Sequence, residues 1–342
     1  MEAIDASFEP CYCGRVLAFA AVGDHEKAEE MFYTARQYLD ECPDCYYNVG
    51  VSLFARGLWD RALYCWRRVC DLDAAYPQVH LRIAEALWEK GKLEEARRHY
   101  LEELRRRPGD LFTVLDLGLL LLDMRSMDEA GEKFRRAVEM APDSAAARFH
   151  LGEWCAMAGD DEQAEAQMTT ALRLDPTFPG AHMRLAEIQL RRGRPLEAHD
   201  HLRAELLLDP DDPATLDELA NLLLDCGDDR AAAAVFRTLT QRRPDLAGGW
   251  ENLAILEFRR GRWDEGMEAS RRAIEADPRS VTARYNLATA FEMLGRYDEA
   301  LEWVAAALEL APTDVPLLRL RRRLQALRLW RSLVRRLAFW RA

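Results

Sequence analysis

The sequence predicts an all-α protein built as a solenoid of antiparallel helix pairs. Only 18 of the 342 residues are Ile or Val, which leaves few β-branched side chains for a large sheet. Seven prolines follow one another at intervals of 34 residues, and a small residue recurs at one fixed place in every 34-residue unit. The prolines are Pro108, Pro142, Pro176, Pro210, Pro244, Pro278 and Pro312.

The 34-residue frame divides the chain into three parts. Residues 1–8 form an N-terminal lead-in, residues 9–314 form about nine repeats of which the first is degenerate, and residues 315–342 form a basic amphipathic C-terminal helix. Each repeat should contain a first helix, a turn with Gly at position 15 and a second helix, and in the last seven repeats a proline at position 32 stops the second helix. Arg125 is the one departure from Gly at the turn.

Small residues explain how the two helices of a repeat approach each other. Position 20 holds Ala in eight units and Gly266 in the remaining one. Position 8 holds Gly or Ala from the second unit on, and a large apolar residue precedes it. Small side chains at both positions let two antiparallel helices pack closely, while the large neighbour fills the space beside them.

Two stretches carry the most specific form of this pattern. One is Tyr46-x-x-Val49-Gly50-x-x-Leu53 with Ala62-x-x-x-Trp66, and the other is Leu117-Gly118-x-x-Leu121 with Ala130-x-x-x-Phe134, ending in Pro142. On these residues the sequence resembles the tetratricopeptide repeat family over about nine tenths of its length. The resemblance implies a right-handed superhelix whose concave face is lined by the first helix of each pair.

Two departures from the family pattern predict local differences. The first unit has Arg15 and Val16 where a large and then a small residue stand elsewhere, so we expect its first helix to be a modified cap. Glu103 and Glu205 occupy the usually small position 27, which predicts altered packing in those two repeats.

The net charge of −12 is distributed unevenly. Residues 315–342 contain nine Arg and no acidic residue, which leaves −21 for residues 1–314. An acidic solenoid disfavours nucleic-acid binding by the repeats. The chain starts with an acidic Met-Glu-Ala-Ile-Asp, no apolar run reaches about 20 residues, and eight Cys are scattered along it. We therefore expect a cytoplasmic protein, with peripheral membrane contact left open.

The sequence contains none of the common catalytic or nucleotide-binding motifs. It has no Gly-rich phosphate loop, no His-Glu-x-x-His, no Gly-x-Ser-x-Gly and no calcium loop, so we expect neither enzymatic activity nor a required cofactor. His80 and His182 fall at an interhelical packing position, which predicts core or half-buried histidines. His199 and His201 lie two residues apart on one helix, and this spacing disfavours a shared metal site.

Cys11, Cys13, Cys42 and Cys45 form the one chemically suggestive cluster. In an antiparallel pair the start of the first helix lies beside the end of the second, so these thiols should meet at one end of the first unit. Four thiolates suit a structural zinc ion at Zn–S distances of about 2.3 Å. The spacing matches no standard zinc motif, so three alternatives stay open: reduced thiols, a zinc or similar site, and a disulfide.

The C-terminal helix carries one continuous apolar stripe from Leu317 to Leu337. Its first half should cover the apolar face of the last repeat. Its second half, from Leu329, suits an interfacial membrane helix, because Trp favours the headgroup level and Arg is attracted to anionic lipid. It suits equally a dock onto the acidic repeats or onto another protein. The residues involved are Trp330, Arg331, Arg335, Arg336 and Trp340.

Positions 5, 9 and 12 of each first helix predict the binding surface, since they lie about 100° from the packing face formed by positions 4, 7, 8 and 11. An exposed apolar patch there marks a site for an amphipathic helix or an extended apolar peptide. In the second to fifth repeats the apolar residues are Tyr47, Val51, Phe54, Leu81, Trp88, Leu115, Leu119, Leu122 and Phe149. Position 6 flanks them with Asn48, Arg82, Asp116, Asn252 and Asn286, and the family resemblance implies that an Asn there can bond to a peptide backbone.

These observations predict a non-enzymatic scaffold that binds a partner protein or peptide in its concave groove. One alternative is a membrane-associated assembly or recruitment factor located by the C-terminal helix. Another is that the superhelix closes on itself or on that helix and buries the apolar residues of the first helices. The fold alone does not assign a function, so the choice depends on the site.

Overall fold

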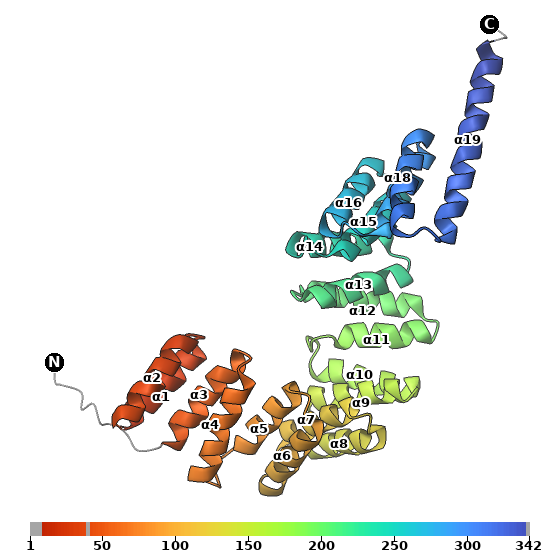
Figure 1. Cartoon of the computed structure of the whole chain (residues 1–342). Coiled ribbons are helices and arrows are strands. Elements are labelled where there is room, and N and C mark those ends of the chain that lie inside the picture. Colours follow the sequence, from red (N-terminus) through yellow and green to blue (C-terminus); the bar gives the residue numbers. More distant parts are fainter. Residues whose placement is uncertain (1–8, 39–41, 340–342) are drawn as a thin grey trace. The chain divides into compact units, whose positions relative to one another are not determined.

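A computed structural model describes the backbone of residues 9–38 and 42–339 and the side chains of residues 14–37 and 42–332. These residues form helices joined by turns and loops and include no strand (Figure 1). Among them, no helix is long and apolar enough to cross a membrane. The chain divides into two compact units, residues 1–176 and residues 177–342. The predicted all-α class is confirmed.

The first unit is a row of helices in sequence order. Each odd-numbered helix packs against the even-numbered helix that follows it, and each even-numbered helix packs against the next odd-numbered one (Figure 1, red to yellow). The helices are α1 (Glu9–Ala21), α2 (His25–Tyr38), α3 (Pro43–Ala55), α4 (Trp59–Leu72), α5 (Val79–Glu89), α6 (Leu93–Arg106), α7 (Leu111–Asp123), α8 (Met127–Met140), α9 (Ala145–Met157) and α10 (Asp161–Leu174).

The second unit repeats this arrangement and ends with a longer helix packed on α18. The second helices of successive pairs, α4 to α18, begin 34 residues apart, which is the period of the prolines. The helices are α11 (Ala181–Arg191), α12 (Pro195–Leu207), α13 (Pro213–Asp225), α14 (Asp229–Arg242), α15 (Ala247–Arg259), α16 (Trp263–Ala276), α17 (Val281–Met293), α18 (Tyr297–Leu310) and α19 (Val315–Phe339).

The turn inside each pair contains a residue in the left-handed region. Gly57 has φ 71°, the turn glycines of the other pairs lie between 69° and 81°, and Arg125 takes the same conformation at φ 60°. Glycine enters this region without steric cost, so the predicted role of position 15 is confirmed. The structure also places Gln78 and Gly180 in the left-handed region, immediately before α5 and α11.

The packing contacts explain the small residues. A Cβ on Gly50 would lie 2.5 Å from Nε1 of Trp66, and a Cβ on Gly118 would lie 2.5 Å from Cε1 of Phe134. The alanines at position 20, such as Ala62, are fully buried. Close approach of the two helices of a pair therefore depends on the absence of larger side chains at these positions.

Two buried carboxylates account for the unusual residue at position 27. Oε1 of Glu205 accepts a hydrogen bond from the backbone N–H of Gly180 at 3.2 Å, and Glu103 accepts one from the backbone N–H of Leu81. The first N–H groups of a helix lack partners within the helix, so these carboxylates cap α11 and α5. Burial raises the pKa of both carboxyls. The altered packing that the sequence predicts in these two repeats is therefore a buried carboxylate that caps the first helix of the repeat.

Candidate partner-binding surface

The predicted binding residues of the first unit lie on α3, α5, α7 and α9. Leu81, Leu115 and Phe149, all at position 5, are only 7%, 4% and 9% exposed. The expectation that they belong to an exposed patch was wrong. The helix wheel gives the direction of a side chain but not the neighbouring helices that cover it, and in these three repeats position 5 is covered.

The six other apolar residues are half-buried, so part of each side chain contacts water. We call them the apolar stripe: Tyr47, Val51, Phe54, Trp88, Leu119 and Leu122. They come from three successive first helices, α3, α5 and α7. The core of each pair is filled by other residues, such as Tyr46 and Leu117. The stripe is therefore additional to the packing that holds the pairs together.

Polar contacts hold the aromatic members of the stripe in place. Nε1 of Trp88 donates a hydrogen bond to Oδ2 of Asp123 at 2.7 Å, which links α5 to the end of α7. The ring of Tyr47 packs on Tyr76 with 5.0 Å between centroids, and Nε of Arg82 donates to the Tyr47 hydroxyl at 3.4 Å. A side chain that is already ordered loses less conformational entropy when it binds a partner.

Carboxylates lie beside the stripe. Glu85 pairs with Arg82 at 2.8 Å. Asp116 has no hydrogen-bond or ion-pair partner among the described side chains, and burial, with the Glu85 charge as the next cause, raises its pKa to about 6. Asp116 is therefore largely ionised at neutral pH, and a positive group placed beside it would be stabilised.

The remaining residues at position 6 fall into three settings. Asn48 and Arg82 are half-buried beside the stripe. Asn252 and Asn286 lie on α15 and α17 in the second unit. Asn286 is buried, and its Nδ2 has no hydrogen-bond partner among the described residues. Only Asn48 among the three asparagines is thus placed beside the stripe.

The proposed metal cluster is only partly described. Cys42 and Cys45 are buried at the start of α3, where Sγ of Cys42 accepts the backbone N–H of Cys45 at 3.4 Å. Cys11 and Cys13 lie on α1, but their side chains are outside the described residues. The described residues contain no group of three or more His, Cys, Asp or Glu that could hold a metal ion. Zinc binding at the four thiols stays a prediction.

Two histidine pairs were missed by the sequence reasoning. The Nδ1 atoms of His80 and His99 lie 2.9 Å apart between α5 and α6, and those of His182 and His201 lie 2.9 Å apart between α11 and α12. Each pair joins residues 19 positions apart in the sequence. The sequence did contain a signal, because each histidine of the second pair lies 102 residues after its counterpart in the first pair. The same two repeats also carry Glu103 and Glu205.

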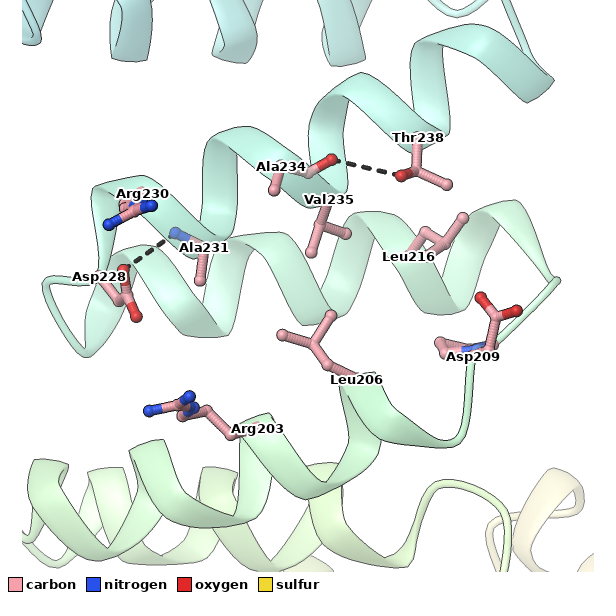
Figure 2. A pocket seen from close by; sticks show the side chains of 11 residues that line it. Arg203, Leu206, Asp209, Leu216, Asp228, Arg230, Ala231, Ala234, Val235 and Thr238 are labelled. Carbon is pink, nitrogen blue, oxygen red and sulfur yellow. Dashed lines mark hydrogen bonds between the residues drawn. The ribbon is translucent and has the colours of Figure 1, made fainter.

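A pocket of about 720 Å³ lies in the second unit, lined by residues of α12, α13 and α14 (Figure 2). Its floor is apolar, with Leu206, Leu216 and Val235, and Arg203 and Arg230 stand at one end in Figure 2. Asp228 also lines the pocket, but it caps α14 by accepting the N–H of Ala231 at 2.9 Å. The lining also includes Thr238, whose hydroxyl donates to the backbone oxygen of Ala234 at 3.3 Å.

Comparisons with known proteins match the repeats. A family model described as the cilia and flagella-associated protein 70 C-terminal domain matches residues 67–245, just over half of the chain. A tetratricopeptide repeat model matches residues 218–278 and 253–315. Protein CTR9 homolog of Arabidopsis thaliana is 26% identical over 136 residues, which are 37% of this chain. The chain spans 12% of the length of that relative.

Solved structures show the same fold. The C-terminal part of a TPR repeat-containing protein from Cytophaga hutchinsonii has a TM-score of 0.56 at 14% identity, over 70% of this chain and 98% of the other. YrrB, described as a TPR protein with an unusual peptide-binding site, has a TM-score of 0.50 at 18% identity, over 56% of this chain and 99% of the other. PilF of Pseudomonas aeruginosa gives 0.50 at 18% identity, over 59% and 92%.

Proposed function

Because the chain belongs to the tetratricopeptide repeat family, whose fold generally mediates protein–protein interaction, we propose that it is a non-enzymatic scaffold that binds a segment of a partner protein along the apolar stripe. The single observation that carries the proposal is the stripe itself. Six apolar side chains on α3, α5 and α7 keep part of their surface in water although the interhelical core is complete without them. Partly exposed apolar surface of this kind favours association.

The chemistry beside the stripe specifies the partner further. Val51, Leu119 and Leu122 favour apolar side chains, because each apolar group removed from water contributes about 25 cal/mol per Å². Asp116 favours a lysine or arginine among them. A peptide segment that combines apolar residues with one basic residue fits both requirements. The peptide-binding site described for YrrB supports a partner of this size on the same fold.

Site-specific photo-crosslinking tests the proposal in the full-length chain. A benzophenone amino acid replaces Leu122 in the stripe, and the matched control carries it at Leu101, which is 37% exposed on the second helix α6 of the same unit. We expect the Leu122 position to crosslink one partner reproducibly and the Leu101 position not to do so. Crosslinking of that partner through Leu101 alone would place the binding surface on the second helices and contradict the proposal.

A further inference from the structure

The helix α19 contacts the repeats differently in its first and second halves. Leu317, Leu320 and Leu324 are buried on the last helix pair, so this part of α19 covers the apolar face of the repeats as expected. The helix has 25 residues, whereas α18 has 14. In Figure 1, α19 (blue) continues beyond the start of α18. This part of α19 is not needed to cover the last repeat.

Between residues 328 and 331, arginine side chains contact the repeat and apolar side chains are exposed to water. Arg328 pairs with Asp298 at 2.8 Å, and Arg331 donates to the backbone oxygen of Gly295 and lies over the ring of Tyr297, 5.7 Å from its centroid. The arginines therefore contact the repeat. Leu329 and Trp330 are each 67% exposed. A helix on a protein core normally turns its apolar residues inward, so these two side chains are placed for a contact outside the chain.

Unpaired positive charge lies on α19 about two to three helical turns before the two apolar side chains. Arg319, Arg321 and Arg322 are exposed and have no ion-pair partner among the described residues. Residues 315–342 contain no acidic side chain that could neutralise them. A surface with Trp, Leu and unpaired Arg is complementary to a membrane interface that carries negative headgroups.

A pocket at the same level of α19 provides room for a headgroup. It has a volume of about 460 Å³ and lies between the start of α18 and α19. Its lining includes Arg296, Arg328, Arg331 and Ser332. It also includes Asp298 and Glu299, which pair with Arg328 and Arg296, so the lining keeps one net positive charge, that of Arg331.

We propose that α19 binds the surface of membranes that contain anionic phospholipids, with Leu329 and Trp330 at the interface and the arginines at the phosphates. This inference goes beyond the scaffold function, because it depends on residues outside the apolar stripe. Indole rings favour the headgroup level, and each basic residue near an anionic surface adds attraction that salt weakens. The chain would then be a peripheral membrane protein held by α19.

Vesicle flotation of the full-length chain tests the apolar part of the proposal. The wild-type chain should float with vesicles of phosphatidylcholine and phosphatidylserine and not with vesicles of phosphatidylcholine alone. Changing both Leu329→Ser and Trp330→Ser should lower the bound fraction about tenfold, since two apolar side chains leave the interface. The matched control is Leu196→Ser with Leu207→Ser, two leucines of α12 that are even more exposed, and it should bind like the wild type.

A second pair of variants tests the electrostatic part. Arg319→Glu with Arg322→Glu should abolish flotation with phosphatidylserine vesicles. Arg203→Glu with Arg230→Glu makes the same change in net charge on exposed arginines of α12 and α14, and it should leave flotation intact. Helicity and thermal unfolding verify that each variant is folded. Failure of the wild-type chain to bind either vesicle, or equal losses in both charge variants, would overturn the proposal and leave an acidic protein surface as the partner of α19.

Discussion

The Nδ1 atoms of His80 and His99 lie 2.9 Å apart between α5 and α6, so the N–H of one imidazole donates a hydrogen bond to the unprotonated nitrogen of the other. This contact requires at least one neutral ring. Burial is the main cause that lowers the pKa of His99 to about 4, and the neighbouring His80 is the next. Burial, followed by Arg106, also lowers the pKa of His80. The pair is a packing contact that holds as long as the rings stay uncharged.

The pair should make the first unit sensitive to acid. The pKa of His99 is about 4 in the folded chain and about 6.5 when unfolded, so between these values the unfolded chain binds more protons and stability falls as the pH is lowered. We expect a loss of about 2 kcal/mol of unfolding free energy between pH 6.5 and pH 4. Urea denaturation of the wild type and of His99→Gln at both pH values measures it. If the His99→Gln variant lost as much unfolding free energy in acid as the wild type, other groups would be the cause of the acid sensitivity.

Asp116 should respond to pH with the opposite sign. Its pKa is about 6 in the folded chain, above the ordinary 3.8, so the folded chain binds more protons and gains stability as the pH falls through 6. Asp116→Asn removes the cost of a half-buried charge and should stabilise the chain by about 1 kcal/mol at pH 7, after allowance for solvent screening. This gain should fall to about a third at pH 4.5, because the carboxyl of the unfolded chain, with a pKa of 3.8, is still mostly ionised there. A gain of equal size at both pH values would contradict the assignment.

The close helix approach at Gly118 gives a steric prediction. Gly118→Ala would place a Cβ 2.5 Å from the ring of Phe134, and this overpacking should cost about 1 to 3 kcal/mol despite the better helix propensity of Ala. Gly152→Ala is the matched control at the same position of the next pair. Its nearest neighbour is the flexible end of Met168 at 3.1 Å, so its effect should stay within about 1 kcal/mol. Equal costs would refute the packing account.

The turn at Arg125 carries removable strain. Its φ of 60° lies in the left-handed region, which costs about 1 kcal/mol or more in a residue with a Cβ. Arg125→Gly should therefore raise the free energy of unfolding by about 0.5 to 1 kcal/mol, because the gain exceeds the added flexibility of the unfolded chain. Thermal unfolding of the two proteins compares them. A lower midpoint in the glycine variant would mean that the Arg125 side chain makes a stabilising contact.

The features that repeat with the 34-residue period could be predicted from the sequence alone. The turn residues such as Gly57 and the small residues such as Gly118 recur in nearly every pair, and the prolines recur in seven, so one pattern read many times predicts them. The helix pairs and the covering role of Leu317 on α19 follow from the same pattern. These are local or nearest-neighbour features, which periodicity reports directly.

Contacts specific to one or two repeats could not be predicted in this way. The histidine pair at His80 depends on two helices meeting at one level, and the cap by Glu205 depends on a left-handed residue at Gly180. The burial of Leu115 and Phe149 depends on the neighbouring helices that cover position 5. The helix wheel contains no information about such neighbours. The choice of the stripe as a binding site therefore needs experiment.

The dissociation constant of the crosslinked partner tests the central claim most directly. Leu119→Asp and Trp88→Ala alter two members of the stripe, and Leu101→Asp on α6 is the control, with helicity measured for all three. The account predicts that each stripe variant weakens binding by about 2 kcal/mol or more, about thirtyfold, with helicity preserved and the control unchanged. Unchanged affinity per folded molecule in both stripe variants, or an equal loss in Leu101→Asp, would contradict it.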